Sequence, residues 1–261
     1  MESFYQKYGS WALITGASSG IGEEFARQLA ALKFNLVLIA RRKQRLEILS
    51  NELINKHHVE VKIIAVDISA DNFLSQIELV TNSLDIGLLI NNAGFALTGN
   101  FSDNTIEKEL SLLNVNCRAP LILLHYFGNE MIRRGKGGII NVASAAAFLP
   151  MPFWANYSAS KAYLLHLSEG LWFELKEKNV DVLALCPGAT KTEFSKVAGT
   201  KNAGMEASEV VKIALQKLGK KPTVIAGSGN RVMTFILKFF SRKLLIKIGA
   251  KVVKSSSNSN T

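Results

Sequence analysis

Cysteine is scarce in this chain of 261 residues, which contains only Cys117 and Cys186. Both lie among apolar residues, so free buried thiols in a reducing compartment fit the sequence better than a disulfide framework. Only four histidines are present, and none has ligand spacing to a carboxylate or a cysteine, so we predict no metal site.

Long apolar runs are absent as well. Hydrophobic residues make up 48% of the chain, enough for a sizeable core. However, no stretch approaches the ~20 uncharged apolar residues that cross a bilayer. Residues 1–9 also lack the apolar centre of a signal peptide. We therefore expect a cytoplasmic protein.

Acidic residues stop at Glu209. Up to that residue, 20 lysines and arginines stand against 21 aspartates and glutamates, whereas the rest of the chain has 11 basic residues and no acid. The net charge of +10 therefore belongs to the C-terminal fifth. A nearly neutral body with one basic end favours a localised acidic partner and argues against nucleic-acid binding.

Strand-like and helix-like segments alternate along the chain. Short apolar runs typical of buried strands lie at 11–15, 35–40, 61–66, 86–91, 138–143, 180–186 and 223–226. Helical patterns lie between them, at 20–33, 42–57, 72–83, 104–134, 154–178 and 208–218. This alternation predicts an α/β fold with a Rossmann-like, doubly wound parallel sheet of about seven strands, helices on both faces, and a single domain.

A glycine-rich turn joins the first strand to a helix. Glycines let the backbone approach a pyrophosphate, and the helix N-terminus adds free amides and a positive dipole end. Tight turns also need glycine for conformational reasons alone, but the position between strand and helix favours cofactor binding. The predicted contacts are Gly16, Ser18, Ser19, Gly20, Ile21 and Gly22.

Residues after the second strand indicate which nicotinamide cofactor binds. An NAD binder carries Asp or Glu there, whereas this chain has Arg41 and Arg42. Their planar donors suit the 2′-phosphate of NADP(H), although a basic first turn of a solvated helix is the alternative. Asp67 and Ile68 follow the third strand, where Asp67 either accepts a hydrogen bond from adenine or caps the next helix.

Tyr157 and Lys161 lie four residues apart, so a helix places them on one face. An ammonium beside a phenol lowers the pKa of the phenol from its usual ~10. Such a tyrosine can pass a proton to or from a substrate oxygen. The spacing alone also occurs by chance on solvated helix faces.

Together these motifs resemble the short-chain dehydrogenase/reductase family, from residue 11 to about residue 194 and more weakly to residue 227. Ala119 stands where many relatives have glycine, a departure that puts nothing essential in doubt. The resemblance rests on the turn from Thr15 to Gly22, the run from Asn91 to Gly94, Asn116, Ser144, Tyr157, Lys161, Pro187 and Gly188.

The resemblance implies a role for each of four polar residues. Tyr157 would be the general acid for carbonyl reduction, and Lys161 would lower its pKa and hold the nicotinamide ribose. Ser144 would orient the substrate oxygen, or it simply ends a strand. Asn116 would hold a water that links Lys161 to solvent, or it is a satisfied core side chain. Further implied cofactor contacts are Asn92, Ala93, Gly94, Pro187, Gly188, Thr190 and Thr192.

Apolar loops would form the substrate side in this family. Here they contain Phe148, Trp154 and Phe194 and no Arg or Lys that could clamp a carboxylate. They favour an apolar carbonyl substrate such as a long-chain ketone, a ketoacyl chain, a steroid or an aromatic aldehyde. The alternative is that these side chains pack against each other or against a neighbouring subunit.

The segment 228–254 contains seven Lys/Arg and no acid. Its basic residues fall on two helical faces, which predicts two short helices with a break near 241–243. Three interpretations remain: a lid over the substrate pocket, a peripheral membrane contact with anionic lipid, or a docking patch for an acidic carrier protein or CoA. Residues 255–261 are predicted to be a disordered tail, and 1–227 the NADP(H)-binding domain.

The leading hypothesis is an NADPH-dependent oxidoreductase that transfers hydride between the nicotinamide and an apolar carbonyl or alcohol, with Tyr157 as general acid and base. A narrower alternative is a 3-ketoacyl reductase acting on acyl carrier protein or CoA. A non-catalytic NADP(H)-binding regulator or scaffold is the third hypothesis, and the intact set of Ser144, Tyr157 and Lys161 argues against it. The resemblance also implies a homodimer or homotetramer.

Overall fold

The computed structural model describes residues 4–200, 202–237 and 239–256. Its main sheet has seven strands in the order β3-β2-β1-β4-β5-β6-β9, and each neighbouring pair is parallel. The fold class predicted from the alternation of segments is therefore confirmed. The strands are β1 (Trp11–Thr15), β2 (Asn35–Ala40), β3 (Val61–Ala65), β4 (Ile86–Asn91), β5 (Gly137–Val142), β6 (Val180–Cys186) and β9 (Thr223–Ile225).

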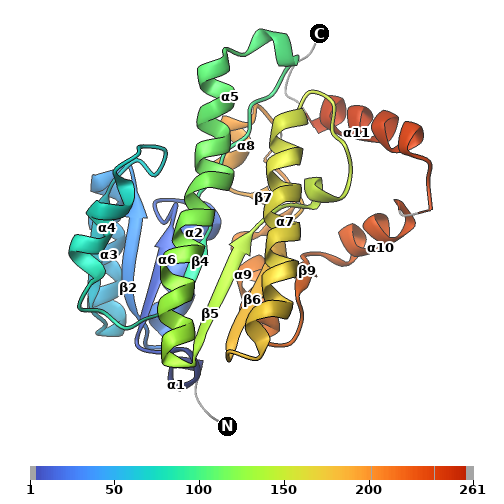
Figure 1. The fold of residues 1–261 in the computed structure, drawn as a ribbon. Coiled ribbons are helices and arrows are strands. Elements are labelled where there is room, and N and C mark those ends of the chain that lie inside the picture. Colours follow the sequence, from blue (N-terminus) through green and yellow to red (C-terminus); the bar gives the residue numbers. More distant parts are fainter. Residues whose placement is uncertain (1–3, 201, 238, 257–261) are drawn as a thin grey trace.

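Helices cover both faces of this sheet (Figure 1). Successive strand residues point to opposite faces, so Leu13 packs in one apolar core and Ile14 in the other. Both faces are buried, which explains why the strands are almost continuously apolar. One face carries α2 (Gly20–Ala31), α3 (Lys43–His57) and α9 (Ala207–Lys217), and the other carries α4 (Phe73–Thr81), α6 (Ala119–Arg134) and α7 (Ala155–Lys176).

The strand order reverses between β1 and β4, which are neighbours in the sheet although two strands separate them in the chain. Open parallel sheets bind ligands in the crevice outside the carboxyl ends of the strands at such a point. The glycine-rich turn after β1 and the polar residues after β4 therefore meet at one edge. The fold itself places the candidate site there.

A π-helical turn interrupts the helix predicted at 104–134. The chain forms α5 (Ile106–Leu113), a π segment (Asn114–Arg118) and then α6 without leaving the helical path. Single π turns inside α-helices occur frequently at functional sites. The buried side chain of Asn116 projects from this turn.

The C-terminal segment forms two helices, α10 (Ser228–Leu237) and α11 (Arg242–Ser256), as its charge pattern predicts. Because α11 continues to Ser256, the first two residues of the expected tail are helical. Residues 257–261 lie outside the described residues. None of the helices in the described ranges is long and apolar enough to span a membrane.

Short elements follow β6 that the sequence patterns did not predict. Two-residue strands β7 (Thr190–Lys191) and β8 (Met205–Glu206) pair in parallel, and the short helix α8 (Phe194–Val197) lies between them in the chain. This segment leaves the carboxyl end of β6 and returns to α9. It therefore forms part of the same edge as the glycine-rich turn.

Candidate active site

The turn after β1 depends on close approach of backbone atoms. Gly16 has a φ of 68°, and a Cβ on it would lie 2.8 Å from the Asn92 side-chain nitrogen. A Cβ on Gly22 would lie 2.3 Å from the Gly16 carbonyl oxygen. Neither position has room for a side chain, so the turn, the first residues of α2 and the end of β4 pack closely through their backbones. Such a cradle fits a pyrophosphate at a helix N-terminus.

Asn92 fastens the end of β4 to this turn. Its side-chain amide donates hydrogen bonds to the carbonyl oxygens of Thr15 at 2.9 Å and Gly16 at 3.2 Å. The backbone nitrogens of Asn92 and Ala93 both donate to the Thr15 hydroxyl. Asn92, by its side chain and backbone, and Ala93, by its backbone nitrogen, therefore hold the glycine-rich turn against the end of β4. The side-chain amide of the preceding residue, Asn91, donates to Asn141 of β5 at 2.9 Å and tethers the two strands.

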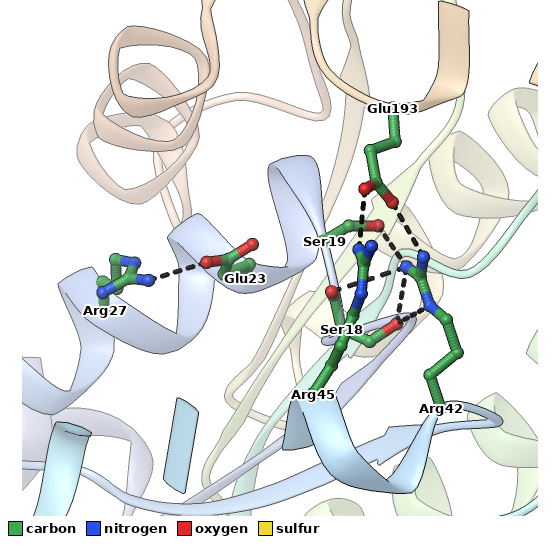
Figure 2. Close-up of polar contacts among 7 residues, drawn as sticks. All are labelled: Ser18, Ser19, Glu23, Arg27, Arg42, Arg45 and Glu193. Atoms are coloured by element: carbon green, nitrogen blue, oxygen red, sulfur yellow. Dashed lines mark hydrogen bonds and ion pairs between the residues drawn. The ribbon is translucent and has the colours of Figure 1, made fainter. Parts of the chain in front are cut away.

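Arg42 lies beside the glycine-rich turn (Figure 2). Its guanidinium donates to the hydroxyl of Ser18 at 3.0 Å and of Ser19 at 2.8 Å. It also donates to a carboxylate oxygen of Glu193 at 2.8 Å, and Arg45 donates to the other oxygen at 2.7 Å. These two arginines hold the pKa of Glu193 at about 2, well below its usual range.

Arg41 points away from this cluster and forms an ion pair with Asp67 at 3.7 Å. The Asp67 carboxylate accepts hydrogen bonds from the backbone and hydroxyl of Ser69. Burial raises the pKa of Asp67, but the hydrogen bonds from Ser69 and the charge of Arg41 together lower it overall. Asp67 thus closes a local turn with Ser69, and the expectation that it caps the next helix is wrong, because α4 begins only at Phe73 with Asn72 at its N-cap position. Ile68 is buried in the core below it.

Tyr157 and Lys161 are buried on the inner face of α7. The Lys161 ammonium donates a hydrogen bond to the Val142 carbonyl at 2.8 Å and lies 5.9 Å from the centroid of the Tyr157 ring. Burial lowers the pKa of Lys161 to about 8. Burial also raises the pKa of Tyr157 to about 12, with the hydrogen bond to Ser144 acting in the opposite direction. The direction expected from Lys161 alone was wrong, because desolvation of the phenolate outweighs it.

Ser144 follows β5 and caps a 3₁₀ turn. Its hydroxyl accepts a hydrogen bond from the Ala146 backbone at 3.1 Å and also faces Tyr157. The residue therefore follows a strand and contacts Tyr157 at the same time. A Cβ on Gly94 would lie 3.1 Å from the Lys161 nitrogen, so the turn after β4 closes the other side of this set.

Asn116 is fully buried on the π turn. Its side chain accepts from the Phe95 backbone nitrogen at 3.1 Å, and donates to the Phe95 carbonyl and the Ser160 hydroxyl at 3.0 Å each. A Cβ on Gly94 would lie 3.0 Å from its carbonyl oxygen. Asn116 thus fixes the loop after β4 beside Lys161, and its hydrogen bonds are those of a satisfied core side chain.

The turn after β6 closes the crevice from the third side. The Pro187 carbonyl accepts from the Ala145 backbone at 2.8 Å. A Cβ on Gly188 would lie 2.1 Å from the Asn230 side chain of α10, so any other residue at 188 would have to displace that side chain. Thr192 packs on Gly20, whereas the Thr190 hydroxyl donates to the nearby Gly188 carbonyl.

Two of the three predicted substrate aromatics surround Tyr157. The rings of Trp154 and Phe194 have centroids 5.4 and 5.7 Å from that of Tyr157. Phe148 instead packs in a separate cluster with Cys186. Phe148 ends the 3₁₀ turn after Ser144, and its side chain packs against β6 and not against Tyr157.

The apolar cluster around Tyr157 includes side chains of both C-terminal helices. Leu237 of α10 and Leu245 and Val253 of α11 are buried in it. A Cβ on Gly249 would lie 2.2 Å from the Pro150 carbonyl, so α11 sits directly on the loop between Ser144 and α7. The lid interpretation of this segment matches its packing.

Sequence patterns missed Glu193 and Asn230. The signal for Glu193 was present as a lone acid between Thr192 and Phe194, two residues already assigned to the site. Only the fold brings it to Arg42, 151 residues earlier. Asn230 had no sequence signal, because its contact with Gly188 depends on where α10 packs.

Comparisons with known proteins match this geometry. The family model described as short chain dehydrogenase covers residues 10–203. The chain belongs to the short-chain dehydrogenase family. The predicted family and oxidoreductase class are thereby confirmed.

Relatives in this family have named activities. The chain is 32% identical over 234 residues to a 7beta-hydroxysteroid dehydrogenase of Clostridium sardiniense, covering 88% of this chain and 90% of that protein. It is 38% identical over 220 residues to a very-long-chain 3-oxoacyl-CoA reductase of Podospora anserina, covering 82% of this chain. The match spans only 65% of the Podospora protein's length.

Solved structures also resemble this fold closely. A 7beta-hydroxysteroid dehydrogenase superimposes with a TM-score of 0.88 at 29% identity, covering 95% of this chain and 99% of that one. A short-chain dehydrogenase from Sphingobium yanoikuyae, solved in complex with NADPH, has a TM-score of 0.79 at 32% identity. That match covers 89% of this chain and 97% of the Sphingobium chain.

Proposed function

We propose that this protein is an NADP(H)-dependent oxidoreductase that reduces an apolar carbonyl compound and, in reverse, oxidises the alcohol. The observation that carries the proposal is the position of Tyr157. Its hydroxyl faces Ser144, its ring is packed between Trp154 and Phe194, and Lys161 lies on the same helix face. A proton donor is thus buried in an apolar cluster beside the cofactor crevice.

NADP(H) is the cofactor that the crevice fits. The bare backbone at Gly16 and Gly22 would hold the pyrophosphate, and Arg42, with Ser18 and Ser19, would hold the 2′-phosphate. The Sphingobium yanoikuyae relative, solved in complex with NADPH and 32% identical to this chain, supports this assignment. The bound cofactor supplies or accepts the hydride.

The side chains supply a proton and electrostatic stabilisation. With a pKa raised to about 12, Tyr157 is fully protonated at neutral pH and can donate to the carbonyl oxygen as negative charge develops on it. Ser144 would orient that oxygen. Lys161, protonated below about pH 8, would stabilise the phenolate left on Tyr157.

The substrate class follows from the wall of the site. The cluster around Tyr157 consists of Ala, Val, Leu, Ile, Met, Phe and Trp side chains, so it offers an apolar body van der Waals contact. A steroid ketone and a 3-oxoacyl thioester both meet this requirement, and relatives named for each are among the matches. The basic helices α10 and α11 favour the thioester as second candidate, since CoA carries phosphates.

The decisive assay is NADPH consumption with steroid ketones, 3-oxoacyl-CoA thioesters and long-chain ketones, run in parallel with NADH. We expect turnover with NADPH on at least one class, and its loss in Tyr157→Phe. If Tyr157→Phe keeps the wild-type rate, this tyrosine is not the proton donor. NADPH binding without turnover on every class would favour the non-catalytic regulator.

The C-terminal helices also present an apolar and basic surface, which we assign to an anionic membrane. Phe235 and Phe239 are 62% and 75% exposed, their rings pack 5.5 Å apart, and an apolar groove of about 610 Å³ follows α10. No acid lies within 228–256. Each basic residue adds about 1 kcal/mol of attraction near an anionic surface. The protein would thus be cytoplasmic with a peripheral membrane contact.

Vesicle sedimentation tests this surface. Wild type should pellet with phosphatidylserine vesicles and remain in the supernatant with phosphatidylcholine vesicles. The double variant Phe235→Ser/Phe239→Ser should lose this binding, whereas Leu79→Ser, on the exposed side of α4, should keep it. Binding to an acidic carrier protein but not to anionic vesicles would overturn the lipid assignment.

A homo-oligomer is the remaining part of the proposal. Exposed apolar side chains occur along α5 and α6, which flank the π turn, and along α7. Leu113 and Tyr163 line a hollow of about 410 Å³ between them. A second copy of this chain would cover these side chains.

A further inference from the structure

Glu193 connects two parts of the crevice that serve different ends of the cofactor. Its carboxylate oxygens accept one hydrogen bond from Arg42 and one from Arg45, at 2.8 and 2.7 Å (Figure 2). Arg42 also bridges to the hydroxyls of Ser18 and Ser19. The Glu193 carboxylate therefore accepts hydrogen bonds from both guanidinium groups next to the glycine-rich turn.

The neighbours of Glu193 in the chain reach both sides of the crevice, since Thr192 lies on the cofactor side and Phe194 on the substrate side. Thr192 packs on Gly20, and the Phe194 ring lies 5.7 Å from the ring of Tyr157. The two ion pairs thus hold the segment before α8 across the crevice. Releasing them would free the segment that carries Phe194.

A 2′-phosphate and Glu193 would compete for the same donors. The two arginines keep the pKa of Glu193 at about 2, so the carboxylate is an anion throughout the physiological range. A phosphate monoester carries about −1.5 to −2 charges at pH 7 and three strong acceptor oxygens, which outmatch one carboxylate. A nicotinamide cofactor without the 2′-phosphate has no group to displace it.

We propose that Glu193 is a specificity-determining residue, an internal anion that the 2′-phosphate of NADP(H) displaces from Arg42 and Arg45, which releases the segment leading into α8. The inference rests on NADP(H) as the cofactor of the proposed function and not on the identity of the substrate. Removing the carboxylate would tighten binding of NADP⁺ and leave binding of NAD⁺ unchanged.

Calorimetric titration with NADP⁺ and NAD⁺ tests the competition. Glu193→Gln should bind NADP⁺ about three- to tenfold more tightly than wild type, because exposed ion pairs are individually weak. Its NAD⁺ affinity should stay within twofold of the wild-type value. The matched control is Glu206→Gln, which removes an exposed acid paired with Lys191 in the same segment without touching Arg42. This control should change neither affinity more than twofold.

Hydrogen–deuterium exchange of the free proteins supplies a second readout. Backbone amides of residues 192–200 should exchange faster in Glu193→Gln than in wild type, and Glu193→Asp, with a shorter reach, should fall between them. Equal or weaker NADP⁺ binding by Glu193→Gln, or unchanged exchange in this segment, would overturn the proposal. Neither readout needs turnover, so failure here is distinguishable from failure of the proposed reaction.

Discussion

The Lys161 ammonium donates a hydrogen bond to the Val142 carbonyl at 2.8 Å, at the point where β5 ends beside Tyr157. This hydrogen bond holds the charged end of the Lys161 side chain in the site. Burial nevertheless lowers the pKa of Lys161 to about 8. The lysine therefore changes its charge within the working range of an enzyme, and two predictions depend on this.

Activity should fall at moderately alkaline pH. The kcat/KM for NADPH reports groups of the enzyme before the cofactor binds. It should be level from pH 6 to about 7.5 and decline with an inflection near pH 8, as Lys161 loses its proton. A pH series at saturating carbonyl substrate measures this inflection. A profile that stays level to pH 9.5 would show that the charge of Lys161 is not required.

The free energy of unfolding should also depend on Lys161, but it should rise with pH where the activity falls. The folded pKa of about 8 lies below the usual 10.5, so the unfolded chain binds more protons between these values. The folded state is therefore penalised below pH 8, by on the order of 3 kcal/mol, and the penalty disappears as pH rises through 10.5.

Lys161→Met should accordingly be more stable than wild type at pH 7, although it would be inactive. The variant also loses the hydrogen bond to Val142, so the net gain in the free energy of unfolding should be about 1–2 kcal/mol. Denaturant unfolding at pH 7 and pH 10 checks this, and the difference between the proteins should shrink at the higher pH. A variant that is less stable at pH 7 contradicts the expected penalty.

Packing of α11 on the loop before α7 should control the substrate site. A Cβ on Gly249 would lie 2.2 Å from the Pro150 carbonyl, so Gly249→Ala must displace the helix. We expect a cost of about 1–3 kcal/mol in the free energy of unfolding. The KM for the apolar substrate should rise, and the Kd for NADPH should stay the same.

The control for this prediction is Gly170→Ala in α7. Nothing lies within 4 Å of the position a Cβ would take there, so the substitution should stabilise the helix by up to about 1 kcal/mol. Steady-state kinetics and thermal unfolding of the two variants side by side separate lid packing from helix propensity. Equal kinetics in both would argue against a lid role for α11.

The apolar side chains on α5 and α7 should be covered by a second copy. Leu113→Arg places a charge in the hollow between these helices and should shift the protein toward monomer in sedimentation velocity. Leu79→Arg, with a side chain that is 82% exposed on α4, should leave the oligomeric state unchanged. A wild-type protein that is monomeric at micromolar concentration would rule out this interface.

Local patterns were sufficient for the sheet and for the cofactor edge. The strand ends were predicted to within one residue, because buried parallel strands are continuous apolar runs bounded by polar turns. The glycine-rich turn and Arg42 were predictable for the same reason, since each lies directly at the end of a strand. Parallel topology then brings those ends together whatever the sequence between them.

Properties that depend on burial or on distant contacts were not predictable. The pKa of Tyr157 moves upward because the whole environment is apolar, which its four-residue spacing from Lys161 does not reveal. The packing of Phe148 away from Tyr157 was not predictable, because the 3₁₀ turn that it ends has no distinctive sequence. Strands as short as Thr190–Lys191 carry no detectable alternation.

The π turn at Asn114–Arg118 has one further consequence, for the tolerance of the chain to changes in length. A π turn holds about one residue more than the α turns on either side. Removing a single residue there would restore an unbroken α-helix, and every side chain before the deletion would rotate relative to α6. Asn116 would then leave the Phe95 backbone while the helix itself became more regular. In this protein a more regular helix would thus remove the side chain that holds the loop after β4 in place.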